Sequence, residues 1–172
     1  NLATALAISG KKVVVMEMDL RKPNLTGKLN LKNDFSFTNY IVSKSVMPTD
    51  VIRASGTHEN LYIISSGNIP PNPSEIILND RTEVLMKTLF EAFDYIIIDA
   101  PPLGLVTDAQ LLAKYADLTL YVVRQGYTFQ AQLSIAQEIY EGKKMKQLSI
   151  LVNDVKNSSS YYEEEARTLK IF

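Results

Sequence analysis

Two apolar strands that each end in acidic residues constrain the fold of this chain more than any other feature. Residues 13–19 read VVVMEMD and residues 95–99 read YIIID, so Glu17, Asp19 and Asp99 close the two runs. Runs of β-branched residues are typical of strands buried on both faces of a parallel α/β sheet. Ligands bind beyond the carboxyl ends of such strands. We therefore expect the three carboxylates to gather at one edge of the sheet.

Converging carboxylates suit a hydrated Mg²⁺ ion that carries the phosphates of a nucleotide. Asp19 and Asp99 are the expected ligands of the Mg²⁺ shell. Glu17 lies two residues before Asp19 on the same strand face, where it would polarise the attacking hydroxyl or water. The plainer alternatives are a solvated strand end for Glu17 and Asp19 and a helix cap for Asp99. Together the two acidic clusters favour nucleotide chemistry.

Composition narrows the class of protein. With 172 residues, 46% of them apolar, the chain has the bulk of one domain with a sizeable core. A formal charge of −1 argues against nucleic acid as a partner, because phosphate binding needs a basic face. The sequence contains no cysteine, which fits a reducing cytoplasm. It also lacks a basic leader for a signal peptide and any apolar run near the roughly 20 residues that cross a bilayer.

Helical and strand patterns alternate along the chain, which predicts right-handed crossovers and a doubly wound, mostly parallel α/β sheet. Helices are expected at residues 2–9, 81–91, 107–114 and 128–142, with short amphipathic pieces at 38–43 and 49–53. Strands are expected at residues 12–18, 61–65, 94–99, 118–123 and 148–152. We predict one domain over residues 1–157, followed by a low-complexity tail over 158–172 with little fixed structure.

Capping motifs place the ends of several expected helices. Residues 72–75 (NPSE) put an asparagine cap before a proline at the first helical position, with a glutamate that reaches back. Residues 80–83 (DRTE) form a second capping motif of the same kind. Thr128 is expected to cap the longer helix that ends near Gly142, and Gly10 is expected to be the left-handed cap of the first helix.

Several polar residues at the ends of expected elements keep two interpretations each. Asn153 could bind an adenine edge or form an Asx turn. Asp108 could serve a ligand or simply stabilise a helix start, where the dipole favours acid. Arg21 completes the charged cluster after the first strand and is assigned, with Asn153, to cofactor binding. Tyr161 and Tyr162 precede three glutamates and are either phosphorylation sites or incidental aromatics of a tail.

A phosphate cradle is absent from these 172 residues. Nucleotide sites of this kind use GxxxxGK followed by Ser or Thr between a strand and a helix, and no such sequence occurs. The helix at residues 2–9 would follow that loop, so we expect the cradle, its lysine and the strand before it just upstream of Asn1. The chain is accordingly expected to begin inside its domain and to bind ATP tightly only with that upstream part.

Taken in order, these motifs resemble the cytoplasmic kinase domain of the bacterial protein-tyrosine kinases (BY-kinases), which are similar to the deviant P-loop ATPases of the chromosome-partitioning group. Residues 17–23 (EMDLRKP) are similar to the Walker A′ motif of that family, and residues 94–102 (DYIIIDAPP) to its Walker B motif. Residues 67–75 (GNIPPNPSE) resemble a loop peculiar to these kinases. Residues 106–109 and 152–155 also fit, so the resemblance covers nearly the whole chain.

The resemblance implies a fold, an activity and partners. The implied fold is a P-loop NTPase-like three-layer sandwich that lacks its first strand and phosphate loop. The implied activity is a tyrosine autokinase that moves the γ-phosphoryl of MgATP to Tyr161 and Tyr162 in the tail of a neighbouring copy, so the chain would form a homo-oligomer. The implied partner is a membrane-embedded polysaccharide chain-length regulator, fused or separate, at the cytoplasmic face of the bacterial inner membrane.

Three features depart from the family pattern. Glu17 stands where the family usually has aspartate, the tail has a reduced cluster of two tyrosines, and the phosphate loop with the arginine-bearing segment before it is not in the sequence. Two alternative functions remain open. One is a partitioning-type ATPase switch without kinase activity, and the other is a non-catalytic regulatory module of the export machinery. Phosphotyrosine formed in the tail with MgATP would separate the kinase from the ATPase switch.

Overall fold

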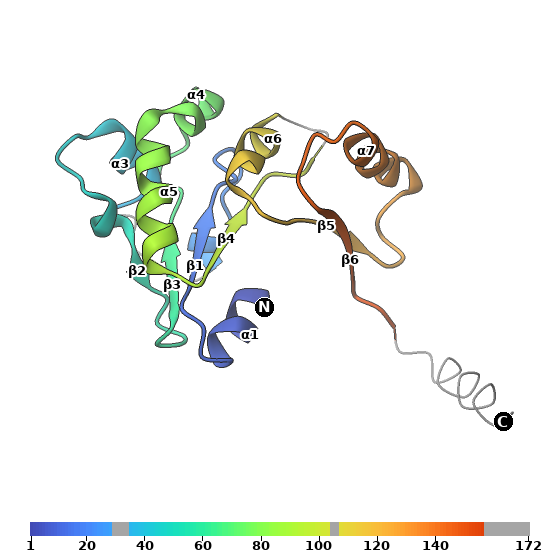
Figure 1. Cartoon of the computed structure of the whole chain (residues 1–172), viewed down its shortest axis with the longest axis horizontal. Helices are drawn as coiled ribbons and strands as arrows, with labels where there is room; N and C mark the ends of the chain where they lie inside the picture. The colour runs from blue at the N-terminus through green and yellow to red at the C-terminus, as the bar shows by residue number, and fades with distance from the viewer. Residues whose placement is uncertain (29–34, 104–106, 157–172) are drawn as a thin grey trace, which may run out of the picture. The chain divides into compact units, whose positions relative to one another are not determined.

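A four-stranded sheet organises residues 1–116, the first of two compact units in a computed structural model of the chain (Figure 1). The structure describes residues 1–28, 35–103 and 107–156. The strands of the first unit are β1 (Val13–Glu17), β2 (Arg53–Ala54), β3 (Leu61–Ile64) and β4 (Tyr95–Asp99). Its α-helices are α1 (Leu2–Ile8), α2 (Leu25–Lys28), α3 (Phe37–Val42), α4 (Pro73–Leu78), α5 (Asp80–Ala92) and α6 (Asp108–Leu112). Short 3₁₀ turns cover Pro48–Val51 and Ala113–Tyr115.

β1 is paired on both sides in the sheet order β2-β3-β1-β4. It runs parallel to β3 and to β4, and its first residue, Val13, lies opposite both Leu61 and Tyr95. The short strand β2, which the sequence pattern did not predict, pairs antiparallel with β3. Parallel pairing of apolar strands is typical of sheets covered on both faces. The predicted α/β class with a mostly parallel sheet is confirmed.

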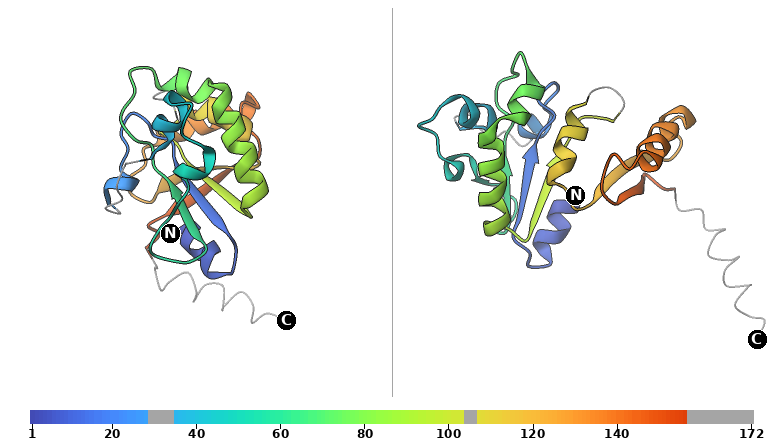
Figure 2. Two further views of the ribbon diagram at one scale, coloured as in Figure 1. Left: turned by 90° about the vertical axis from the view of Figure 1, so that its left-hand side faces the viewer. Right: turned by 45° about the horizontal axis from the view of Figure 1, so that its top comes forward.

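The side chains of β1 alternate between two buried layers. Val14 and Met16 belong to a core that includes residues of α3, α4, α5 and α6, whereas Val13 packs with Ala3 and Ala7 of α1. Figure 2 shows α5 running alongside the strands. Alternation on a period of two sends neighbouring residues to opposite faces, and each fully buried aliphatic side chain contributes about 1.5–3 kcal/mol. Burial on both faces therefore fixes the register of β1 and the position of its acidic end.

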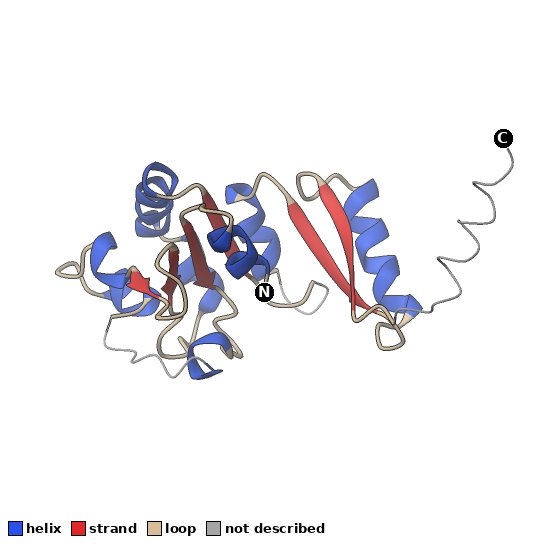
Figure 3. Ribbon diagram, turned by 90° about the horizontal axis from the view of Figure 1, so that it is seen from below, coloured by secondary structure: helices blue, strands red, loops and turns tan. Residues whose placement is uncertain are grey.

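The second unit is built from two parallel strands and the helix between them. β5 (Thr119–Arg124), α7 (Gln130–Glu141) and β6 (Leu148–Asn153) follow one another as a single crossover. Parallel strands need such a crossover because a tight hairpin can join only antiparallel ones. Figure 3 shows α7 beside both strands, and the helix residues Ala136 and Ile139 are buried.

Helix caps account for most differences between the predicted and observed elements. α5 is capped by Asn79, whose side-chain oxygen accepts the backbone N–H of Arg81 at 3.0 Å, so the prediction of a cap at Asp80 is wrong. Asn72 does occupy the cap position of α4, but its side chain donates to the Glu75 carboxylate instead of accepting a backbone N–H. The first correction arises because the adjacent Asn79 and Asp80 compete for the same capping role, and the second because the Glu75 carboxylate engages the Asn72 side chain.

The start of α7 also differs from the prediction. The helix begins one residue later than a Thr128 cap would place it, because the Thr128 hydroxyl accepts the backbone N–H of Arg124 at 2.8 Å. This contact closes the turn between β5 and α7. The left-handed conformation expected of Gly10 is confirmed by its φ of 84°.

Among the described residues, no helix combines the length and the apolar character that crossing a bilayer requires. The prediction of a single domain over residues 1–157 stays a prediction. The tail predicted over residues 158–172 lies outside the described residues.

Arg81 joins α5 to α3 and the loop after it. Its Nε donates to the carbonyl of Tyr40 at 2.8 Å, and its Nη2 donates to the carbonyls of Val46 at 2.6 Å and Ser43 at 3.4 Å. The guanidinium carbon lies 4.1 Å from the centroid of the Tyr40 ring. The Tyr40 hydroxyl in turn donates to the carbonyl of Arg81 at 3.0 Å. One arginine thus satisfies carbonyl groups in the last turn of α3 and in the loop after it, and holds them against the first turn of α5.

Replacing Arg81 by alanine is expected to lower the free energy of unfolding by about 2 kcal/mol, because charge-assisted hydrogen bonds to carbonyls and a ring contact are lost. Urea denaturation of the purified protein measures the change. Lys87→Ala is the matched control on the same helix, because Lys87 makes an exposed ion pair with Glu83 at 2.9 Å and such pairs contribute about 0–1 kcal/mol. Equal midpoints for the two variants would contradict this role of Arg81.

Candidate functional site

The acidic ends of β1 and β4 lie side by side. The parallel register puts Glu17 directly opposite Asp99, and the backbone N–H of Met18 donates to the carbonyl of Asp99 at 2.8 Å. Asp19 follows one residue later, beyond the end of β1. Backbone pairing therefore brings Glu17 and Asp99 together at one edge of the sheet, and Asp19 lies two residues after Glu17 in the chain.

Asp19 organises the loop that leaves β1. Its Oδ1 accepts the backbone N–H groups of Arg21 at 3.2 Å and Lys22 at 3.0 Å. An aspartate that accepts from the backbone two or three residues later forms an Asx-type turn. The turn fixes the half-buried carboxylate near the strand end, while Asp99 is exposed.

The donor set fits magnesium better than a metal that needs an all-protein cage. Within the described part of the chain, no group of three or more His, Cys, Asp or Glu residues is arranged to hold a metal ion. Mg²⁺ keeps several waters and is commonly held by one or two carboxylates together with substrate phosphates. Asp19 and Asp99, both hard oxygen donors, fit that requirement. Their assignment as Mg²⁺ ligands stays a prediction.

Glu17 is buried, with 1% of its surface exposed, and hydrogen bonds surround its carboxylate. Oε1 accepts the backbone N–H groups of Leu25 at 2.5 Å and Thr26 at 3.2 Å, at the start of α2. Oε2 accepts the Thr26 hydroxyl, and also the hydroxyl and backbone N–H of Ser66 at 2.9 and 3.3 Å. We call these contacts the Glu17 clasp.

The hydrogen bonds of the Glu17 clasp stabilise the ionised form of the Glu17 carboxyl. Burial raises the pKa of this carboxyl, but the donors of Thr26 and Ser66 outweigh that effect and bring the pKa below its ordinary value. The group is therefore ionised, and a substrate hydroxyl would have to displace one of its present donors. The predicted role of Glu17 in activating a hydroxyl stays a prediction.

Arg21 pairs with a carboxylate that the sequence analysis left with two interpretations. Its Nε donates to Oδ2 of Asp108 at 2.7 Å and its Nη2 donates to Oδ1 at 3.3 Å. Ser74 adds its hydroxyl to the same Oδ1 at 2.6 Å. The Arg21 hydrogen bond lowers the pKa of Asp108, burial opposes that shift, and Ser74 adds to the lowering. Asp108 begins α6, as one interpretation expected, but its carboxylate is used to link segments far apart in sequence.

Asn153, the other residue assigned to the cofactor, lies in the second unit. Its backbone carbonyl accepts the N–H of Gln125 at 3.0 Å at the end of β6. Nearby, Arg124 pairs with Asp154 at 2.8 Å and lies over the ring of Tyr127, 5.3 Å from its centroid. These contacts join the residues that follow β5 to the end of β6. The adenine role of Asn153 stays a prediction. Tyr161 and Tyr162 lie outside the described residues.

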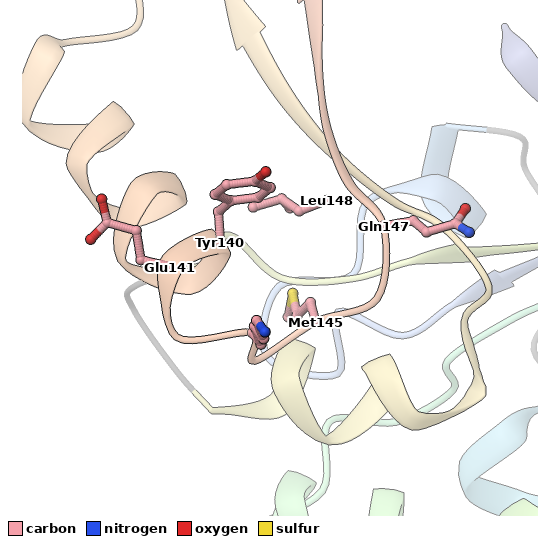
Figure 4. A pocket seen from close by; sticks show the side chains of 6 residues that line it. Tyr140, Glu141, Met145, Gln147 and Leu148 are labelled. Carbon is pink, nitrogen blue, oxygen red and sulfur yellow. The ribbon is translucent and has the colours of Figure 1, made fainter.

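A hollow of about 420 Å³ is also present in the second unit (Figure 4). Its lining consists of Tyr140, Glu141, Lys143, Met145, Gln147 and Leu148. None of the residues predicted for nucleotide chemistry is among them.

Comparisons with known proteins agree with this geometry. The AAA domain family matches residues 1–150. The tyrosine-protein kinase YwqD of Bacillus subtilis is 35% identical over 158 residues, which cover 92% of this chain and 66% of YwqD. The tyrosine-protein kinase CpsD of Streptococcus agalactiae is 31% identical, with 94% of this chain and 69% of CpsD covered. The tyrosine-protein kinase ptk of Acinetobacter johnsonii is 33% identical, and the chain spans 22% of its length.

Solved structures give the same result. The chimerical protein CapA2B2 superposes with a TM-score of 0.83 and 32% identity, covering 91% of this chain and 69% of the other. A plasmid partition protein of Borrelia burgdorferi bound to AMPPNP shares the fold, with a TM-score of 0.66, 19% identity, and 99% of this chain and 75% of the other covered. With its paired acidic strand ends and these relatives, the chain belongs to the AAA domain family and to the bacterial protein-tyrosine kinases.

Proposed function

We propose that this chain carries the magnesium-binding side of an ATP-dependent protein-tyrosine autokinase. The observation that carries the proposal is the parallel pairing of β1 with β4, which sets Glu17 opposite Asp99 and brings Asp19 to the same edge. Asp19 and Asp99 would hold Mg²⁺ beside the β- and γ-phosphates of ATP. The ion would neutralise the charge that develops as the γ-phosphoryl moves to a tyrosine hydroxyl.

The residues of this chain contribute position and charge to such a transfer. Phosphoryl transfer asks little covalent chemistry of a protein and depends on alignment and electrostatic stabilisation. The Asx-type turn of Asp19 holds that carboxylate where the strand ends. The Glu17 clasp holds the start of α2 and the loop at Ser66 beside it. Each contact restricts the motion of a group near the site.

A phosphate-binding loop is the part that the 172 residues do not supply. We propose that it belongs to the same protein, outside this sequence, because the activity requires backbone N–H groups and a lysine on the β- and γ-phosphates. The chain spans 66% of YwqD, so the activity of a whole protein of this family is a proposal for this chain.

The proposed acceptors are Tyr161 and Tyr162 in the tail of a neighbouring copy. A phosphotyrosine next to three glutamates adds charge to an acidic segment and would weaken association between copies by repulsion. We propose that phosphorylation of the tail regulates polymerisation and export of a capsule polysaccharide or exopolysaccharide. The expected partner is a membrane-embedded chain-length regulator at the cytoplasmic face of the bacterial inner membrane.

Replacing Asp99 by asparagine in the complete protein is expected to abolish phosphotyrosine formation, with a loss of at least about 100-fold, because a neutral amide stabilises the cation poorly. Labelling with MgATP and detection by a phosphotyrosine antibody measure the loss. Asp117→Asn, an exposed aspartate outside the site, is the matched control. Unchanged labelling of the Asp99 variant would refute the assignment. ATP hydrolysis by the unsubstituted protein without phosphotyrosine would instead favour a partitioning-type switch.

Replacing both Tyr161 and Tyr162 by phenylalanine is expected to remove tail labelling while MgATP still binds, because the change deletes only the acceptor hydroxyls. Mass spectrometry of the tail peptide and equilibrium binding of MgATP are the two measurements. Persistent phosphotyrosine in the tail peptide would defeat the acceptor assignment.

Replacing Glu17 by glutamine is expected to lower the free energy of unfolding at pH 7 by about 1–3 kcal/mol, because buried donors lose a charged acceptor. A lowered pKa in the folded state means that the carboxylate stabilises the fold fully above the ordinary value of 4.5 and loses this effect as pH falls. The difference between the two proteins should therefore shrink below about pH 4.5 in urea denaturation at several pH values. A difference that does not change with pH would argue against the clasp.

A second variant separates the clasp from catalysis by Glu17. Thr26→Val removes a hydroxyl donor of the clasp and leaves the carboxylate in place. If Glu17 activates the acceptor hydroxyl, the Glu17→Gln protein loses phosphotyrosine formation much more than the Thr26→Val protein does. Parallel losses in the two variants would assign Glu17 to positioning alone.

A further inference from the structure

Asp108 is a buried charged group that the proposed reaction does not yet use. Its side chain is 2% exposed, and its carboxylate accepts two hydrogen bonds from Arg21 and one from Ser74. A buried carboxylate costs several kcal/mol unless it is paired and hydrogen-bonded. The contacts with Arg21 and Ser74 are therefore needed to keep the charge in this place.

The three partners come from segments that are far apart in the sequence. Arg21 lies in the loop that leaves β1, Ser74 lies in the first turn of α4, and Asp108 is the first residue of α6. The carboxylate thus links the loop after β1 to two helices of the first unit. The Asx-type turn of Asp19 already fixes the backbone of Arg21.

The side chain of Arg21 is fixed as well as its backbone. A guanidinium that meets a carboxylate through two N–H groups is held in one plane, unlike a lysine ammonium. The pair uses Nε and Nη2, so Nη1 is on the part of the fork that Asp108 does not engage. The Arg21 side chain is 43% exposed, which leaves it accessible to a ligand. The charge of Asp19 also acts on the guanidinium.

We infer that Asp108 is a positioning residue that holds Arg21 with Nη1 presented to a phosphate oxygen of a nucleoside triphosphate. This inference rests on the proposed function, because the phosphate is that of the proposed MgATP. It gives Arg21, which was assigned to the cofactor only by its place in the sequence, a defined orientation. Ser74 supports the carboxylate and acts one step further from the ligand.

A double-mutant cycle in the complete protein tests the inference. Four proteins are compared: the unsubstituted protein, Asp108→Asn, Arg21→Ala and the double variant. The readouts are the Kd of a fluorescent, non-hydrolysable MgATP analogue, the KM for ATP and the kcat for phosphotyrosine formation. Asp108→Asn is expected to raise Kd and KM about tenfold with a smaller change in kcat, because a freely rotating arginine binds phosphate less well. In the Arg21→Ala background the same change should alter Kd by less than about twofold.

Glu83→Gln is the matched control, because it removes a carboxylate from an exposed ion pair with Lys87. It should leave Kd and KM unchanged. If the Asp108 variant does not fold, Ser74→Ala keeps the Arg21–Asp108 pair and is expected to raise Kd about two- to threefold.

Two outcomes would overturn the inference. One is an equal rise in Kd on Asp108→Asn with and without Arg21, which would mean that Asp108 acts by another route. The other is a lower unfolding temperature with Kd and KM unchanged, which would make the pair structural only. An unsubstituted protein that binds the MgATP analogue but forms no phosphotyrosine would refute the kinase proposal, while the binding cycle would still decide the role of Asp108.

Discussion

The parallel pairing of β1 with β3 and β4 is the constraint on which the rest of the first unit depends. It sets Glu17 opposite Asp99, and it requires helices on both faces of the sheet because every residue of β1 must be covered. A shift of one residue in register would send Val14 and Met16 to the face of α1 and would expose their present partners. The position of the acidic edge is therefore as well determined as the apolar core itself.

Carboxylates hold several of the loops at that edge. Glu17 anchors the start of α2 and Ser66, Asp19 turns the chain after β1, and Asp108 gathers Arg21 and Ser74. Burial of Glu17 and Asp108 is tolerated because donors surround each charge. The arrangement that gathers carboxylates at this edge also makes its loops depend on ionised side chains.

The sequence was sufficient to predict the elements whose signal is local and periodic. β1, β3, β4, β5 and β6 follow from apolar runs, and the alternation of strands with helices gave the fold class. β2 is two residues long, too short for a period, and the cap of α5 depended on a choice between the adjacent Asn79 and Asp80. The Thr128 hydroxyl accepts the backbone N–H of Arg124 instead of capping α7. The partners of Glu17 and Asp108 could not be predicted, because Ser66 and Arg21 lie 49 and 87 residues away in sequence.

In the loop after β3, a position with a strict steric requirement lies next to a residue of the candidate site. Gly67 has a φ of 88°, and a Cβ atom there would overlap the hydroxyls of Ser36 and Thr38 at the start of α3. Ser66, next to it, belongs to the Glu17 clasp. Any side chain at position 67 would thus disturb the candidate site by steric displacement of its neighbour. Sensitivity of this position to substitution is no sign that the loop touches a substrate.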